Sequence, residues 1–160
     1  GMPHLRHLDL SEAVIAEQED IGFGHFPANT IPEGTLNGAP LQSVVLPGSL
    51  TAIGSEAFAV CQSLTDIIIP LGVTTIGNRA FLACSGLTGT LTIPASVTTI
   101  GEMAFADCPL AAVRLLNPAP VPHTENMFSA GLTIYVPEAS LDAYRTAEGW
   151  NSNGYTFIGE

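Results

Sequence analysis

Two stretches of the sequence repeat each other: VTTIGNRAFLACSGL, residues 73–87, and VTTIGEMAFADCPL, residues 97–110. Around them, five kinds of residue recur at intervals of 23 and 24 positions. The columns are Pro47, Pro70 and Pro94; Ile53, Ile76 and Ile100; Gly54, Gly77 and Gly101; Phe58, Phe81 and Phe105; and Cys61, Cys84 and Cys108. A period of this length predicts a solenoid or a propeller built from structural repeats.

The period extends in weaker form toward both ends. Upstream, Ile31 aligns with Ile53 and Leu36 with Phe58, and this first repeat carries about 13 extra residues. Downstream, Phe128 follows Phe105 by 23 positions, although the isoleucine and glycine are replaced. We expect one domain over residues 1–160. Its parts are an irregular first repeat (5–36), three regular repeats (41–110), a degenerate repeat (111–131), and a half repeat with a cap (132–160).

Each repeat contains a segment typical of a short β-strand. In LTDIIIP, residues 64–70, Ile67 and Ile69 share one face, Ile68 lies on the other, and the proline ends the strand. The equivalent inward pairs are Leu8/Leu10, Val44/Leu46, Leu91/Ile93, Val113/Leu115 and Ile134/Val136. Each such strand should therefore have one inward and one outward face.

The rest of the repeat predicts tighter structure. VTTI indicates a second short extended piece that ends at Gly77 or Gly101, where we expect a turn with positive φ. NRAFLAC, residues 78–84, is too short for a free helix and predicts one helical turn held by its phenylalanine and cysteine. PEASLDAYRTAEGW, from Pro137, predicts an amphipathic capping helix. Its inward residues are Leu141, Tyr144 and Ala147.

Composition excludes several classes of partner. Apolar residues make up 46% of the chain, yet no apolar run approaches the roughly 18 residues of a membrane span, so we expect no membrane insertion. The four basic residues are all arginines, and 15 acids leave a net charge of -11. Nucleic acid is therefore excluded as a partner, because binding it requires a basic face. Gly1 before Met2 suggests tag removal, so a missing export signal is uninformative.

The repeated phenylalanines and cysteines are best explained by packing. Phe58, Phe81, Phe105 and Phe128 should stack in the core, because a coil buries its apolar face only against its neighbours. The three cysteines form one column, where a bridge is feasible, but small buried thiols are the commoner arrangement. No histidine recurs in this register to activate a cysteine nucleophile.

Other polar residues give no assembled site. His4 and His7 are three apart but lie on opposite faces of a strand, and His25 and His123 are assigned to irregular loops. The extra residues of the first repeat carry Glu12, Glu17, Glu19 and Asp20, which form either a calcium site or, as we favour, a solvated acidic loop. We predict no cofactor, no metal and no enzymatic activity.

One row remains as the candidate binding surface. The residues that point outward from successive strands are Asp9, Val45, Ile68, Thr92, Arg114 and Tyr135. Arginine and aromatic residues are enriched in binding interfaces, which favours a docking surface on this face. The alternative is that Val45 and Ile68 only reflect the β-propensity of an exposed sheet.

The motif L-x-x-L-x-L-P followed by V-T-x-I-G-x-x-A-F-x-x-C-x-x-L resembles the BspA-type leucine-rich repeats of bacterial surface proteins. The resemblance is specific over residues 41–110 and moderate up to Trp150, where the chain resembles the closing segment of such arrays. It implies a right-handed solenoid with a parallel sheet along one side and short strands, turns and helical turns elsewhere. It also implies export and adhesion, and no reaction.

The functional prediction is a noncatalytic binding or adhesion module of a cell-surface or secreted bacterial protein. Its partner would be a host, extracellular-matrix or envelope protein that contacts the outward row. The rival is a carbohydrate-binding module, in which an exposed Tyr135 or Trp150 stacks on sugar rings.

Overall fold

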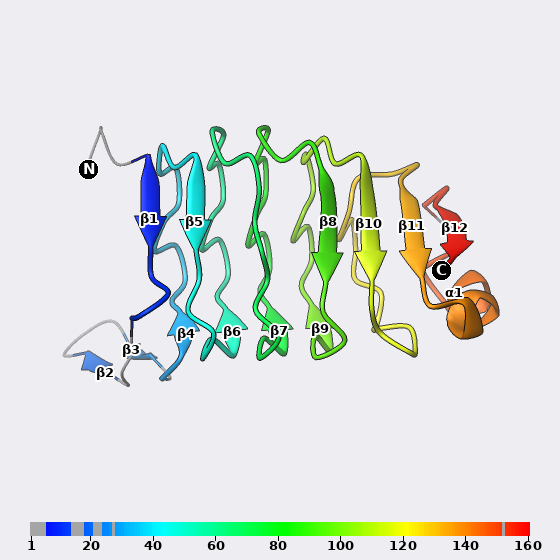
Figure 1. Cartoon of the computed structure of the whole chain (residues 1–160), viewed down its shortest axis with the longest axis horizontal. Helices are drawn as coiled ribbons and strands as arrows, with labels where there is room; N and C mark the ends of the chain where they lie inside the picture. The colour runs from blue at the N-terminus through cyan, green and yellow to red at the C-terminus, as the bar shows by residue number, and fades with distance from the viewer. Residues whose placement is uncertain (1–5, 14–17, 21–23, 27, 152) are drawn as a thin grey trace.

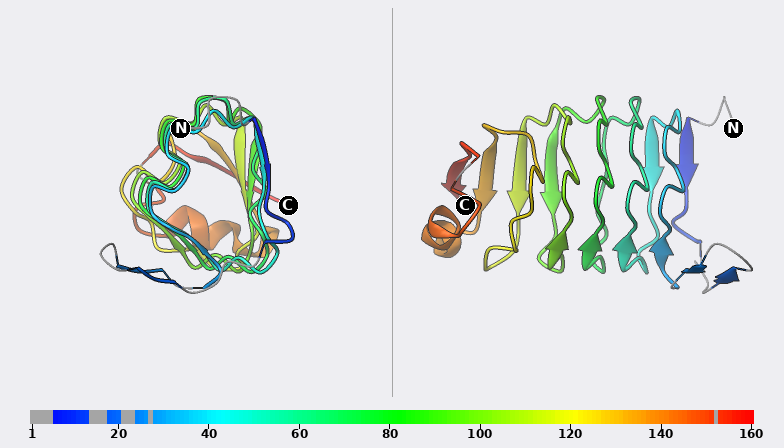
Figure 2. Two further views of the ribbon diagram at one scale, coloured as in Figure 1. Left: turned by 90° about the vertical axis from the view of Figure 1, so that its left-hand side faces the viewer. Right: turned by 180° about the vertical axis from the view of Figure 1, so that it is seen from behind.

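The computed structural model describes residues 6–13, 18–20, 24–26, 28–151 and 153–160. The chain winds into coils stacked along one long axis (Figure 1). Viewed along that axis, the coils superpose into one closed outline (Figure 2). One period of the sequence therefore forms one turn of a β-solenoid, as the repeats predict.

The strand face is the first wall of the solenoid and consists of two parallel sheets. One sheet pairs β1 (His7–Asp9) with β5 (Ser43–Val45). The other contains, in order, β8 (Thr90–Ile93), β10 (Ala112–Leu115), β11 (Thr133–Val136) and β12 (Thr156–Gly159). Residues 66–69 lie between the two sheets and belong to neither.

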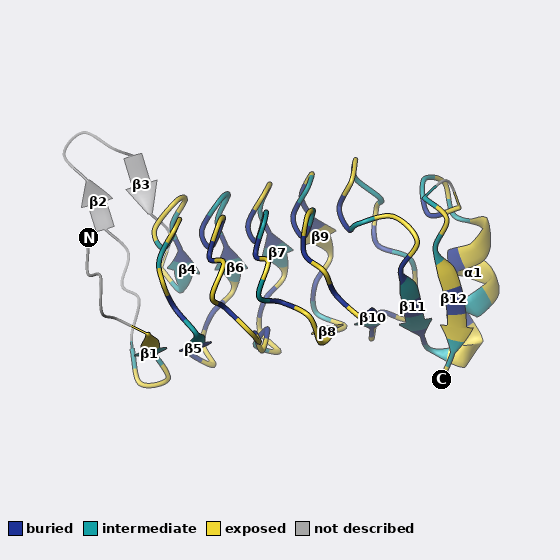
Figure 3. Ribbon diagram, turned by 90° about the horizontal axis from the view of Figure 1, so that it is seen from above, coloured by how far each residue is buried: buried dark blue, intermediate teal, exposed yellow. Residues whose placement is uncertain are grey.

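The predicted inward pairs of this wall point into the core. The pairs of the second to sixth coils are all buried, and Leu8 and Leu10 of the first coil are partly buried and pack against the same core. The register aligns the pairs, with Leu8 beside Val44 and Leu91 beside Val113. Exposed and buried residues alternate along β8, and Figure 3 shows both classes along the regular coils.

A third parallel sheet forms the next wall from four two-residue strands: β4 (Thr30–Ile31), β6 (Ala52–Ile53), β7 (Thr75–Ile76) and β9 (Thr99–Ile100). The register confirms the predicted alignment of Ile31 with Ile53. The glycines that follow have no positive φ, contrary to the prediction. A Cβ on Gly77 would instead lie 2.5 Å from the backbone nitrogen of Ser55, so close approach of adjacent coils requires the glycine.

The turn wall, residues 54–61, 77–84 and 101–108 with their equivalents, closes each coil. It consists of consecutive turns, so the predicted helical turn is wrong. Arg79 and Ala83 have φ of 55° and 56°, which is left-handed and incompatible with a right-handed helical turn. This geometry directs every second N–H toward the next coil, as in the 2.8 Å bond from Phe58 N to Ala80 O.

Two further pieces extend the stack at its ends. The extra residues of the first repeat include an antiparallel hairpin of β2 (Gln18–Asp20) and β3 (Gly24–Phe26), which projects from the coil outline (Figure 2). At the other end, η1 (Glu138–Ser140) and α1 (Leu141–Thr146) replace the longer predicted helix. Among the described residues, no helix has the length and apolar character needed to cross a membrane.

Candidate functional site

The repeated aromatic residues build the scaffold. Phe58, Phe81, Phe105 and Phe128 are each at most 2% exposed, and successive rings stack with centroids 5.0, 5.0 and 5.5 Å apart. The predicted core column is therefore confirmed. These rings are unavailable to a ligand.

The repeated cysteines are free, buried thiols. Each Sγ donates to a carbonyl of the preceding coil, from Cys61 to Leu36, Cys84 to Phe58 and Cys108 to Phe81, at 3.0 to 3.1 Å. Burial raises the pKa of Cys61, which disfavours the reactive thiolate. The column therefore forms contacts between successive coils.

The histidines lie apart from one another where they are described. His7 bonds Ser43 Oγ at 2.8 Å, His4 lies outside the described residues, and His25 lies in β3 where a loop was predicted. His123 Nε2 accepts a 3.0 Å bond from the Asn153 amide, a partner that the sequence did not indicate. Burial lowers the pKa of His123.

The acidic residues of the first repeat are only partly described. Glu12 is exposed, Glu17 lies outside the described residues, and Glu19 and Asp20 lie in β2. Within the described ranges, no group of three or more His, Cys, Asp or Glu side chains is placed to hold a metal ion.

The predicted outward row lies on one face of the solenoid. The register places Asp9 beside Val45, and Thr92 beside Arg114, which in turn lies beside Tyr135. Ile68 lies on the unpaired stretch between the two sheets, and β12 adds Ile158 next to Tyr135. Whether a partner contacts these residues stays a prediction.

The central part of the strand face is apolar. Ile68 is 76% exposed and Val45 is 49% exposed, although each lies between buried neighbours. Two further exposed leucines, Leu71 and Leu116, were not predicted because they follow the strands. A sequence signal existed for Leu71, since the other regular repeats have glycine or alanine after the same proline.

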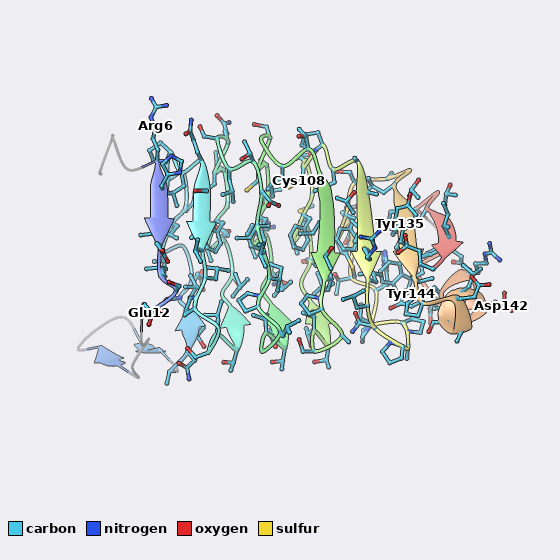
Figure 4. The ribbon with its side chains drawn as sticks, in the orientation of Figure 1. Arg6, Glu12, Cys108, Tyr135, Asp142 and Tyr144 are labelled. Atoms are coloured by element: carbon cyan, nitrogen blue, oxygen red, sulfur yellow. The ribbon has the colours of Figure 1, made fainter. Side chains whose placement is uncertain are left out.

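The C-terminal part of the strand face is polar and internally paired. Arg114 donates two hydrogen bonds to the Glu160 carboxylate, at 2.7 and 3.0 Å, and its guanidinium lies 5.5 Å from the centre of the Tyr135 ring. The bonds from Arg114 lower the pKa of Glu160. Figure 4 shows Tyr135 on β11, where the ring is half-buried. The bonds to Glu160 and the contact with Tyr135 thus orient the Arg114 side chain.

Neither aromatic residue predicted as a sugar platform has a fully open ring. Trp150 is 1% exposed, and its Nε1 donates to the carbonyl of Val121 at 2.9 Å, so its predicted exposure is wrong. It packs edge to face against Tyr144, which is also buried. The Arg114 guanidinium lies over one face of the Tyr135 ring, which leaves less of the ring open for a sugar to stack on.

Comparison with known proteins identifies the repeats. Residues 25–119 match the family described as BspA type leucine rich repeat region, in 6 copies. A leucine-rich repeat protein from Bacteroides capillosus is 29% identical, with a TM-score of 0.53 over 68% of this chain and 75% of that protein. Another from Bacteroides ovatus, also 29% identical, has a TM-score of 0.52 over 82% of this chain and 29% of its own.

A third similar structure supports the fold alone. The T. pallidum leucine rich repeat protein is 23% identical, with a TM-score of 0.54 over 88% of this chain and 82% of that protein. No curated protein matches the sequence. The family match covers more than half of the chain and includes Phe58, Phe81 and Phe105 together with the three cysteines. The chain belongs to the BspA-type leucine-rich repeat family.

Proposed function

We propose that this chain is a noncatalytic protein-binding module that acts outside the bacterial cell or on its surface. A host, extracellular-matrix or envelope protein would contact the strand face. The observation that carries the proposal is the exposure of Ile68, at 76%, beside Val45 and Leu71 in a wall whose inward residues are buried. A group of exposed aliphatic side chains is typical of an interaction site, whereas a single one needs no explanation.

The rest of the molecule supports a binding role. The described cysteines and the phenylalanine column are used in packing, and stacked coils give a rigid, extended face. Arg114 and Tyr135 add residue types that are common at interfaces, held by Glu160. We treat residues 1–160 as one domain, a division that stays a prediction.

The test is a binding assay with purified domain against immobilised extracellular-matrix proteins and an envelope fraction. We compare the wild type with an Ile68→Ser/Arg114→Gln double variant and with a Val60→Ser control. Val60 is 42% exposed but lies on the turn wall. The expected result is capture by wild type and control and loss in the double variant, with circular dichroism unchanged. Equal capture by all three proteins would remove the strand face from the proposal.

A glycan array tests the rival class. Because Trp150 is buried and Arg114 covers Tyr135, we expect no glycan to be retained. Retention that is lost on Tyr135→Ala replacement would favour a carbohydrate-binding module instead.

A further inference from the structure

The break in the strand face coincides with one extra residue in the repeat. In the third coil, Ile67 follows the buried Leu64 by three positions. In the next coil, the equivalent Leu91 follows Leu87 by four positions, so this repeat is one residue longer. Gly89, within this longer segment, contacts the following coil, because its carbonyl accepts a 3.0 Å hydrogen bond from Ala111 N–H. Within the described chain, no backbone hydrogen bond joins residues 67–69 to β5 or β8. The two sheets are therefore separated at this coil.

A groove of about 370 Å³ lies at this break. One side is formed by residues 66–69 and Leu71, and the groove continues to Leu116. The opposite side consists of Thr90, Thr92 and Pro94. Ile68, Leu71 and Leu116 are 76%, 81% and 42% exposed, so its most prominent side chains are aliphatic. The groove follows the strand direction, which suits an extended segment of a partner chain.

The charge of the groove is negative. Asp66 is the charged residue among those that line it, and Asp66 Oδ1 accepts a 2.9 Å bond from Ile67 N while the residue remains exposed. Arg114, on the same wall, is already paired with Glu160. Arg6 lies at the far end of the stack, by β1 (Figure 4). None of the described residues that line the groove is basic, so an arriving cation would meet a carboxylate that accepts one backbone hydrogen bond and has no cationic partner in the groove.

A second copy of the chain is a poor occupant on electrostatic grounds. Each copy carries a net charge of -11, and two such copies would repel each other over distances of about 8 to 10 Å at moderate salt. The same charge attracts a basic partner and accelerates its association.

We propose that this groove binds an extended segment of a basic partner protein, with a lysine or arginine beside Asp66 and an aliphatic side chain between Ile68, Leu71 and Leu116. The assignment rests on the proposed protein-binding function and specifies the chemistry of its partner. It also places the principal contact at the break, rather than at Arg114 and Tyr135.

The test measures binding of three synthetic peptides by fluorescence anisotropy. One alternates lysine with leucine, the second has glutamate in place of lysine, and the third has serine in place of leucine. The lysine–leucine peptide should bind, and the other two should bind at least about tenfold more weakly. A Leu71→Ser/Leu116→Ser double variant should lose about tenfold in affinity, because it removes both exposed leucines.

The charge contribution is tested separately with Asp66→Asn. We expect a loss of about threefold and a shallower dependence on salt, because an exposed ion pair contributes modestly. The Val60→Ser control should bind as the wild type does. Equal affinity of the lysine and glutamate peptides, or full binding by the double leucine variant, would overturn the assignment.

Two outcomes distinguish this assignment from the broader proposal. Partner capture that is lost in Arg114→Gln but kept in the double leucine variant would show that the strand face binds elsewhere, and the groove assignment would be wrong. A dimer in sedimentation analysis of the wild type that dissociates in the double leucine variant would assign the groove to a second copy and overturn the basic partner.

Discussion

The turn wall and the strand face differ in what their sequences preserve from coil to coil. On the turn wall the same phenylalanine and cysteine return in every regular repeat. Each phenylalanine stacks on its equivalent in the next coil, and each cysteine donates to a backbone carbonyl of the preceding coil. On the strand face the outward position changes from valine to isoleucine, threonine, arginine and tyrosine, although Thr92, Arg114 and Tyr135 lie side by side in register. Repetition thus marks positions that stack, whereas variation at a fixed, exposed position leaves room for recognition.

The largest expected effect is on the turn wall. Phe81→Ala should lower the free energy of unfolding by roughly 3 to 5 kcal/mol, because the ring is fully buried between two stacked neighbours. Ile68→Ala, on the strand face, should change it by less than about 0.5 kcal/mol, since most of the side chain is already in water. Urea denaturation measures both. Similar losses for the two variants would contradict the assignment of separate roles.

Glycine replacement sharpens the comparison. Gly77→Ala should destabilise the protein by roughly 1 to 3 kcal/mol, because the new Cβ would lie 2.5 Å from the Ser55 nitrogen and the coils would have to separate. Gly89→Ala is the matched control, as a Cβ there meets nothing within 4 Å. Thermal unfolding of both variants is the measurement. A tolerated alanine at Gly77 would show that the coils are not so closely stacked.

Two exposed valines should respond in opposite directions. Val60 has a φ of 60°, a left-handed conformation that is strained for a β-branched residue, so Val60→Gly should stabilise the protein by about 1 kcal/mol. Val45 lies in β5, where glycine should destabilise by roughly 0.5 to 1 kcal/mol. Denaturant midpoints give both signs. A destabilised Val60→Gly variant would indicate that its side chain contributes more than its strained backbone costs.

The smallest effect concerns pH and the C-terminal cap. Burial lowers the pKa of His123 in the folded protein, so the unfolded chain binds a proton more readily. The contribution of neutral His123 to stability should be present above pH 6.5, the ordinary pKa, and should decline as pH falls through the lower folded value. His123→Gln should remove this component from a series of thermal unfolding curves between pH 8 and about 5. If stability varied with pH in the His123→Gln variant as it does in the wild type, His123 would not contribute to the pH dependence.

The solenoid could be predicted because its signals repeat. Five columns in one register determine coil length, the buried face of each strand and the stacked phenylalanines. The prediction at Gly77 was right about the need for glycine but wrong about the reason, because the approach of a neighbouring coil is a tertiary contact. The helical turn was wrong because left-handed residues such as Arg79 allow N–H groups to bond between coils rather than within one.

The candidate site was less predictable because it depends on irregularities. The interval of 24 residues was visible in the sequence, but its association with a break at residues 66–69 appears only in the hydrogen bonding of adjacent coils. The exposure of Leu71 and the burial of Trp150 likewise depend on what packs over them. A periodic pattern predicts which side chains are buried well within the regular repeats. It predicts burial poorly for residues that follow a strand, such as Leu71, and for residues of the C-terminal cap, such as Trp150.

The measurement that tests the central claim most directly is hydrogen–deuterium exchange of this domain with and without a captured partner. Peptides covering residues 43–47, 66–71, 90–94 and 112–116 of the strand face and groove should become protected. Peptides covering the turn wall, residues 54–61 and 77–84, should exchange as in the free protein. Protection confined to the turn wall would contradict the account, because the repeated residues would then serve recognition as well as packing.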